Sequence, residues 1–161
     1  MQLGAVLDPT TTYRYSLWRS WNSDAPRIGF VMLNPSRADA TVNDPTIRRC
    51  IRFAQTWNFG SLEVVNLFAY RTADPSTLRH VADPIGSEND RYLTAFGDRV
   101  ACILLAWGNG GTLLGRDRAV LPLFAQRPVY CIGTTKLGQP RHPLYVRADV
   151  LYVQFAGNGE S

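Results

Sequence analysis

The sequence predicts an α/β protein, a three-layer α/β/α sandwich with a central, mostly parallel four-stranded sheet and an N-terminal β-hairpin. Short, continuously apolar runs recur along the chain, which is typical of strands that are buried on both faces. Segments with helical start signals lie between these runs, so that strands and helices alternate. The four runs are residues 28–33, 62–68, 100–106 and 129–132.

The chain before the first of these strands has a different pattern. Residues 13–21 alternate aromatic or apolar side chains with polar ones, which is the period-2 pattern of a half-buried strand near the edge of a sheet. We therefore interpret residues 1–27 as an N-terminal β extension of the central fold.

Three segments are expected to be helical. The first, residues 45–57, follows Asp44, a suitable N-cap, and begins with Pro45, which is favoured in the first turn of a helix. The remaining expected elements are two helices and a final strand-like segment, at residues 87–96, 116–124 and 150–155.

The composition is that of a globular protein. The chain has 161 residues, of which 45% are hydrophobic and 19% are charged. These values fit one domain over residues 1–161, with residues 157–161 as a flexible tail, and exclude a disordered or fibrous protein. The longest apolar run, residues 100–107, is far shorter than the roughly 20 residues of a membrane helix. Because residues 1–7 also lack the positive charges of a secretory signal, we expect a cytoplasmic monomer with no membrane partner.

The basic residues are almost all arginines. Lysine and arginine total 17 against 13 acidic residues, which gives a net charge of +4, and Lys136 is the only lysine. Arginine binds phosphate groups through two parallel hydrogen bonds, so a nucleic-acid partner would account for this composition. A GC-rich genome would account for it equally well. The three cysteines lie far apart and only two histidines are present, so we expect neither a metal site nor a cofactor.

Polar residues follow the predicted strands at their carboxyl ends. Asn34 follows the first strand, Asn66 lies near the end of the second, and Trp107 ends the third. A loop through residues 135–142 follows the fourth strand. Ligand sites of α/β proteins lie at this edge of the sheet, so we expect these segments to form one site.

Four short motifs at these strand ends resemble the uracil-DNA glycosylase superfamily in their order and spacing. The resemblance covers roughly residues 28–153 and implies a uracil-DNA glycosylase-like fold and a DNA base glycosylase. The motifs are Met-Leu-Asn-Pro-Ser at residues 32–36, Val-Asn-Leu at 65–67, Leu-Leu-Ala-Trp-Gly at 104–108 and Arg-His-Pro-Leu-Tyr at 141–145.

A second, narrower resemblance brings no chemistry with it. Residues 34–39, 44–50 and 140–145 resemble a bacterial and phage family that is defined only as a domain of unknown function.

The first resemblance implies two catalytic residues. Asn34 takes the place of the residue that positions the attacking water, and His142 takes the place of the residue that donates a hydrogen bond to a carbonyl oxygen of the leaving base. The residues alone leave other interpretations open. Asn34 before Pro35 is also a common way to start a turn, and His142 could be an exposed loop histidine.

Four further residues are expected to bind the base. Asn66 offers a donor and an acceptor to a base turned out of the DNA stack, although it could instead be a buried residue that caps a turn. Tyr70 and Phe68 could stack on that base or simply pack in the core. Ser36 stands where the uracil enzymes have a tyrosine that blocks pyrimidines substituted at C5. We therefore expect a C5-modified pyrimidine, such as hydroxymethylated or glucosylated cytosine in phage DNA, and a role in defence against phage.

The remaining predicted site residues are polar groups beside these motifs. Contacts to DNA phosphates are expected from Arg48, Arg49, Arg71, Thr135, Lys136, Arg141, Tyr145 and Arg147. An extension of the pocket is expected from Asp39, Asp44, Thr46, Glu88 and Asn89, of which the last two could equally cap a helix. Tyr145 or Val146 would be the side chain that enters the DNA stack.

The sequence thus predicts a monofunctional, metal-independent glycosylase whose partner is duplex DNA with a modified base. The first alternative is a module on the same fold that binds a modified base or nucleotide without cleaving it, because Asn34 stands where the uracil enzymes have aspartate. The second alternative is an enzyme of free nucleotides or nucleosides, and a shallow salt dependence of binding would distinguish it.

Overall fold

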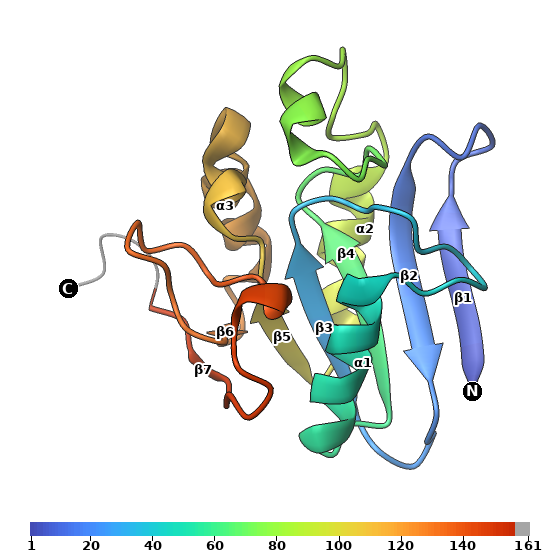
Figure 1. Cartoon of the computed structure of the whole chain (residues 1–161), viewed down its shortest axis with the longest axis vertical. Coiled ribbons are helices and arrows are strands. Elements are labelled where there is room, and N and C mark those ends of the chain that lie inside the picture. The colour runs from blue at the N-terminus through green and yellow to red at the C-terminus, as the bar shows by residue number, and fades with distance from the viewer. Residues whose placement is uncertain (157–161) are drawn as a thin grey trace.

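Seven strands form one sheet in the computed structural model of the chain, which describes residues 1–156 (Figure 1). Their order across the sheet is β1-β2-β4-β3-β5-β6-β7. The pairs β3–β4, β3–β5 and β5–β6 are parallel, and the pairs β1–β2, β2–β4 and β6–β7 are antiparallel. The bounds are β1 Gln2–Leu7, β2 Arg14–Ser20, β3 Arg27–Met32, β4 Ser61–Asn66, β5 Cys102–Leu105, β6 Tyr130–Cys131 and β7 Val153–Gln154.

This mixed sheet shows that the predicted fold class is wrong. We expected a sandwich around a four-stranded, mostly parallel sheet, whereas the sheet has seven strands and half of its strand pairs are antiparallel. The difference arises at the two edges. β2 pairs with β4 over four residues, from Leu17 opposite Val64 to Ser20 opposite Ser61, and β7 pairs with β6. β1 and β2 do form the predicted N-terminal hairpin, but β2 also pairs with β4, so the hairpin is an integral part of the sheet.

A bulge in β2 determines which of its side chains face α1 and which face α2. Opposite the consecutive residues Val6 and Leu7, β2 presents Ser16 and then Arg14, so Tyr15 is an extra residue in the ladder. Such an insertion interrupts the alternation of side chains between the two faces, so that residues before and after it no longer follow one pattern. Leu17 packs under α1, whereas Tyr15 stacks on Tyr92 of α2. Both faces of β2 are thus covered, and the expectation of a half-buried strand is wrong.

Helices cover both faces of the sheet (Figure 1). The helix α1 (Pro45–Thr56) packs on one face, and its start confirms the prediction, with Asp44 as N-cap and a proline in the first turn. The helices α2 (Asn89–Phe96) and α3 (Arg116–Val120) pack on the other face. The third predicted helix is shorter than expected because Leu121–Phe124 continues it as a 3-10 turn that contains a proline.

The parallel pairing brings the carboxyl ends of β3, β4 and β5 to one edge of the sheet. The segments that follow these strands, together with residues 133–146, surround the site described below. Among residues 1–156, no helix has the length and apolar character needed to cross a bilayer. The predicted flexible tail, residues 157–161, lies outside the described residues.

Candidate active site

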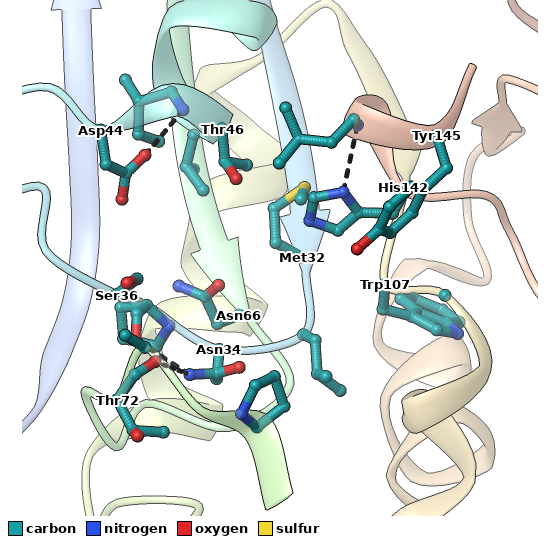
Figure 2. A pocket seen from close by; sticks show the side chains of 18 of the residues that line it. Met32, Asn34, Ser36, Asp44, Thr46, Asn66, Thr72, Trp107, His142 and Tyr145 are labelled. Atoms are coloured by element: carbon teal, nitrogen blue, oxygen red, sulfur yellow. Dashed lines mark hydrogen bonds between the residues drawn. The ribbon is translucent and has the colours of Figure 1, made fainter.

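A cavity of about 510 Å³ opens at the carboxyl ends of β3, β4 and β5 (Figure 2). Its wall combines apolar side chains with several polar groups that converge from separate segments. The predicted site residues that line it are Asn34, Ser36, Asp44, Thr46, Asn66, Thr135, Arg141, His142 and Tyr145. The structure therefore brings together both predicted catalytic residues and two of the four predicted base-binding residues.

The side chain of Asn34 is fixed in one orientation. Its Nδ2 atom donates hydrogen bonds to the backbone oxygens of Pro35 and Thr72, both at 2.9 Å. Both N–H bonds of the amide are used in this way, so the amide cannot be flipped without losing them. Figure 2 shows the Oδ1 atom on the opposite side of the amide from these bonds, where it faces the cavity. Asn34 thus presents a hydrogen-bond acceptor to a ligand.

Asn66 presents an unsatisfied amide at the base of the cavity. The residue is 1% exposed, and neither Oδ1 nor Nδ2 has a hydrogen-bond partner among the described residues. It is the last residue of β4 and lies opposite Met32 at the end of β3. A buried polar group without a partner costs about 1–3 kcal/mol. Such groups are rare in folded proteins, and this residue of the cavity wall has a donor and an acceptor that are both unused.

The backbone around Asn66 is held by a second buried asparagine. Asn89, at the start of α2, is fully buried, and its Nδ2 donates to the backbone oxygens of Asn66 and Leu67 at 2.9 and 3.1 Å. The Nε atom of Arg116 donates to the same Leu67 oxygen at 3.0 Å. Asn89 was predicted to extend the pocket, but its contacts make it a positioning residue for Asn66.

His142 is held as a neutral donor. Its Nδ1 accepts a hydrogen bond from the backbone N–H of Leu144 at 3.1 Å, which leaves the proton of the neutral ring on Nε2. Burial lowers the pKa of His142 below its ordinary value, and the charge of Asp44 opposes this only in part. In Figure 2 the second ring nitrogen faces the middle of the cavity. The ring therefore offers an N–H donor from the side opposite Asn66.

Arg49 holds the loop that carries His142. Its Nε donates to the backbone oxygen of Pro143 at 3.2 Å, its Nη2 donates to the backbone oxygen of Val146, and its guanidinium lies over the Phe53 ring. We predicted that Arg49 contacts DNA phosphate. Two of its hydrogen bonds instead join α1 to the His142 loop, which makes Arg49 a positioning residue for that loop.

A buried arginine that the sequence pattern does not predict as a site residue lines the same cavity. Arg14 is 2% exposed, and its Nη1 donates to the backbone oxygen of Ala38 at 3.0 Å. Asp44 accepts from the N–H of Ala38 at 3.2 Å and from the N–H of Ile47 at 2.9 Å. Strict alternation along residues 13–21 would place Arg14 on the face opposite Leu17, and only the bulge at Tyr15 turns it toward the cavity.

Four of the other predicted residues lie outside the cavity wall for structural reasons. Phe68 is fully buried in the core that packs against α2 and α3. Tyr70 packs edge-on against Tyr13, with ring centroids 6.0 Å apart. Arg71 donates to the backbone oxygens of Thr11 and Arg37. The carboxylate of Asp39 accepts from the backbone N–H groups of Thr41 and Val42, and these bonds lower the pKa of Asp39.

The remaining four are exposed. Arg48 donates to the backbone oxygen of Asn43, Glu88 pairs with Arg91, and Arg147 pairs with Asp149. Lys136 lies in the loop beside the cavity. Tyr145, at the rim, is 78% exposed, whereas Val146 packs against the core, so that Tyr145 is the more accessible of the two predicted stack-entering residues.

Two groups that hold predicted residues were not expected from the sequence. The first is the backbone oxygen of Thr72, which orients Asn34, and the second is Arg49, which holds the His142 loop. Trp107, which was expected at this edge, lines the wall and donates from Nε1 to Gln139 at 2.8 Å. A backbone acceptor leaves no signal in the sequence. Within the described part of the chain, no three His, Cys, Asp or Glu side chains are placed to hold a metal ion. The three cysteines, Cys50, Cys102 and Cys131, are free and buried.

Comparison with known proteins identifies a family but no activity. A family described as "Protein of unknown function (DUF1643)" matches residues 14–144. The chain belongs to the DUF1643 family. No curated protein and no solved structure is significantly similar to it. The DUF1643 match begins at Arg14 and includes Asn34, Asn66 and His142, so these three polar residues of the cavity lie within the matched region.

Proposed function

We propose that the chain is a DNA glycosylase that binds a flipped-out, modified base in this cavity and hydrolyses its N-glycosidic bond. The observation that carries the proposal is the amide of Asn66, a buried donor and acceptor pair without partners among the described residues. A base presents a complementary acceptor and donor on its pairing edge, and enzymes that excise bases recognise that edge.

The other polar groups fit the hydrolysis. The C1′–N bond breaks, and its electron pair leaves with the base. The oxygen of a water molecule bonds to C1′, and the proton it loses passes to solvent. Asn34, with Oδ1 fixed toward the cavity, can accept a hydrogen bond from that water and so orient it. An amide is a poor base, so we expect a slow enzyme that relies on orientation.

His142 acts on the leaving group. A neutral ring with its proton on Nε2 can donate to the carbonyl oxygen on which negative charge develops as the bond breaks. Its fixed tautomer means that no reorganisation is required during the reaction. The arrangement of Asn34 and His142 supports a mechanism like that implied by the resemblance of the sequence motifs to the uracil-DNA glycosylase superfamily.

The size and lining of the cavity favour a large base. Ser36, a small and half-buried residue, stands in the wall beside Asn34. The volume of about 510 Å³ exceeds what an unmodified pyrimidine ring requires. We therefore propose a pyrimidine with a substituent at C5, such as hydroxymethylated or glucosylated cytosine, and a role against phage DNA that carries such bases. Arg141 and Thr135 at the cavity, with the exposed Lys136 nearby, would contact the phosphates.

A reader of modified bases that does not cleave them is the second candidate. The observation that favours it is the fixed amide of Asn34, which cannot deprotonate water as a carboxylate can. The same Asn66 edge and the same cavity would serve binding without hydrolysis.

The test is base release from a panel of duplex oligonucleotides in the presence of EDTA. The substrates carry uracil, a thymine mismatch, 5-methylcytosine, 5-hydroxymethylcytosine or glucosylated 5-hydroxymethylcytosine at one position, and alkali-sensitive strand breaks score release. We expect breaks with a C5-modified cytosine that are lost in Asn34→Ala and His142→Ala and retained in His80→Ala, an exposed histidine outside the cavity. Salt-sensitive binding without breaks would support the reader instead.

A further inference from the structure

We propose that Arg14 and Asp44 form a subsite for a neutral, hydroxyl-bearing substituent on the bound base. This inference rests on the proposed function, because it concerns the part of the same cavity that the C5 substituent would occupy. Both side chains line the cavity, and both are at least nine-tenths buried, with exposures of 2% and 8%.

Both charged groups bind the backbone of Ala38. Arg14 donates to its oxygen at 3.0 Å, and Asp44 accepts from its N–H at 3.2 Å. The two side chains therefore bind opposite ends of one residue's backbone. Among the described residues, Arg14 has no carboxylate within the 4.0 Å of an ion pair. A guanidinium and a carboxylate thus face one cavity without neutralising each other directly.

Each group has hydrogen-bonding capacity left. The Nε atom of Arg14 is buried and has no partner among the described residues. Each carboxylate oxygen of Asp44 accepts one backbone N–H and can accept a further bond. Unused capacity of this kind in buried charged groups is costly, and a ligand that satisfies it is bound selectively.

The charge balance identifies the chemistry of the ligand. An anionic substituent would be attracted by Arg14 but repelled by Asp44, and a cationic one would meet the opposite problem. A hydroxyl group both donates and accepts, so one hydroxyl or a pair of them can satisfy both side chains without adding charge. The hydroxyl of Thr46, also in the wall, adds a third polar contact. A methyl substituent would leave all three unsatisfied.

The test is equilibrium binding of three nucleosides by calorimetry: 5-methyl-2′-deoxycytidine, 5-hydroxymethyl-2′-deoxycytidine and the glucosylated form of the latter. We expect the wild-type protein to prefer a hydroxylated nucleoside over the methylated one by at least about tenfold, as expected for hydrogen bonds to charged groups. Preference for the glucosylated form over the hydroxymethyl form would assign the subsite to a sugar, and the reverse order would assign it to a single hydroxyl.

Two variants and a matched control connect the preference to these residues. Arg14→Met keeps the volume and removes the donors, and Asp44→Asn keeps an N-cap and removes the charge. Each should reduce the preference to less than about threefold. Arg19 is the control, because it is also buried on β2 and donates to backbone oxygens of the same loop, at Asp39 and Val42, but does not line the cavity. Arg19→Met should retain the preference if folded, as measured by circular dichroism.

The outcomes separate this inference from the proposed function. Equal binding of the methylated and hydroxylated nucleosides, or no binding of any of the three, overturns the subsite even if base release is observed. A preference that Arg14→Met and Asp44→Asn leave unchanged overturns it as well. A preference that both variants abolish supports the subsite even if no base is released, in which case only the hydrolytic step of the proposed function fails.

Discussion

Two buried asparagines, Asn66 at the end of β4 and Asn89 at the start of α2, should respond to substitution in opposite directions. Asn66 is 1% exposed, and both of its side-chain polar atoms lack partners among the described residues. Replacing it with leucine, which has nearly the same shape, removes two unsatisfied atoms that each cost about 1–3 kcal/mol when fully desolvated. Because the amide borders a cavity, we discount the sum for the two atoms and expect Asn66→Leu to stabilise the fold by about 1–2 kcal/mol.

Asn89 is the matched control for this substitution. It is equally buried, and its Oδ1 also lacks a partner, but its Nδ2 makes hydrogen bonds of 2.9 and 3.1 Å to the backbone oxygens of Asn66 and Leu67. Asn89→Leu removes both bonds, and the oxygen of Leu67 keeps only its bond from Arg116. We expect Asn89→Leu to destabilise the fold by about 1–3 kcal/mol.

Thermal unfolding followed by circular dichroism measures both effects. For a chain of this length, 1 kcal/mol corresponds to roughly 2–4 °C, so Asn66→Leu should raise Tm by roughly 2–8 °C and Asn89→Leu should lower it. The stabilised variant should also lose binding of the modified base. If Asn66→Leu lowers Tm as much as Asn89→Leu does, the amide of Asn66 is a structural group, and our reason for assigning it to ligand recognition is wrong.

Two further predictions concern the His142 loop. Arg49→Ala removes the donors to Pro143 and Val146, so base release should fall several-fold and Tm by a few degrees. The control Arg48→Ala removes an exposed side chain bound only to Asn43 and should leave Tm within about 1 °C. Equal effects of the two substitutions on Tm would contradict the role of Arg49. The pKa of His142 lies below the ordinary 6.5 because burial disfavours the charged ring, so its neutral form contributes stability above pH 6.5 that is lost as pH falls through the folded-state pKa. Unfolding measured from pH 7.5 downward should therefore show a smaller loss of stability in His142→Gln than in the wild type, and identical pH profiles would contradict the assignment.

The order of the elements along the chain could be predicted from the sequence, but the pairing of the strands in the sheet could not. The apolar runs and the Asp44-Pro45 signal locate β3, β4, β5 and α1 to within a few residues, because these elements depend on local patterns. The antiparallel edges depend on pairing between distant segments, such as Ser20 with Ser61, and pairing of this kind has no local signature. This is why the sequence pattern predicts the N-terminal hairpin but not its pairing with β4.

The site was predictable where it depends on strand ends and not where it depends on irregular backbone. Asn34, Asn66 and His142 follow or end strands, and the topology brings them to one cavity. Arg14 enters the same cavity only because of a bulge of one residue. The roles of Arg49 and Asn89 depend on backbone oxygens of distant segments, which carry no residue-type signal, and both residues were therefore assigned to contacts with the ligand.

The two bonds that fix Asn34 restrict which substitutions this chain can accept at that position over evolutionary time. A single nucleotide change converts asparagine to aspartate, but a carboxylate here would place an oxygen 2.9 Å from the backbone oxygens of Pro35 and Thr72, where the amide now donates. Such a carboxylate would be repelled or forced to take up a proton, and so would not serve as a base. The exchange becomes useful only if the backbone at both Pro35 and Thr72 moves as well. A lineage that acquires aspartate at this position should therefore carry compensating changes beside Pro35 and in residues 70–73.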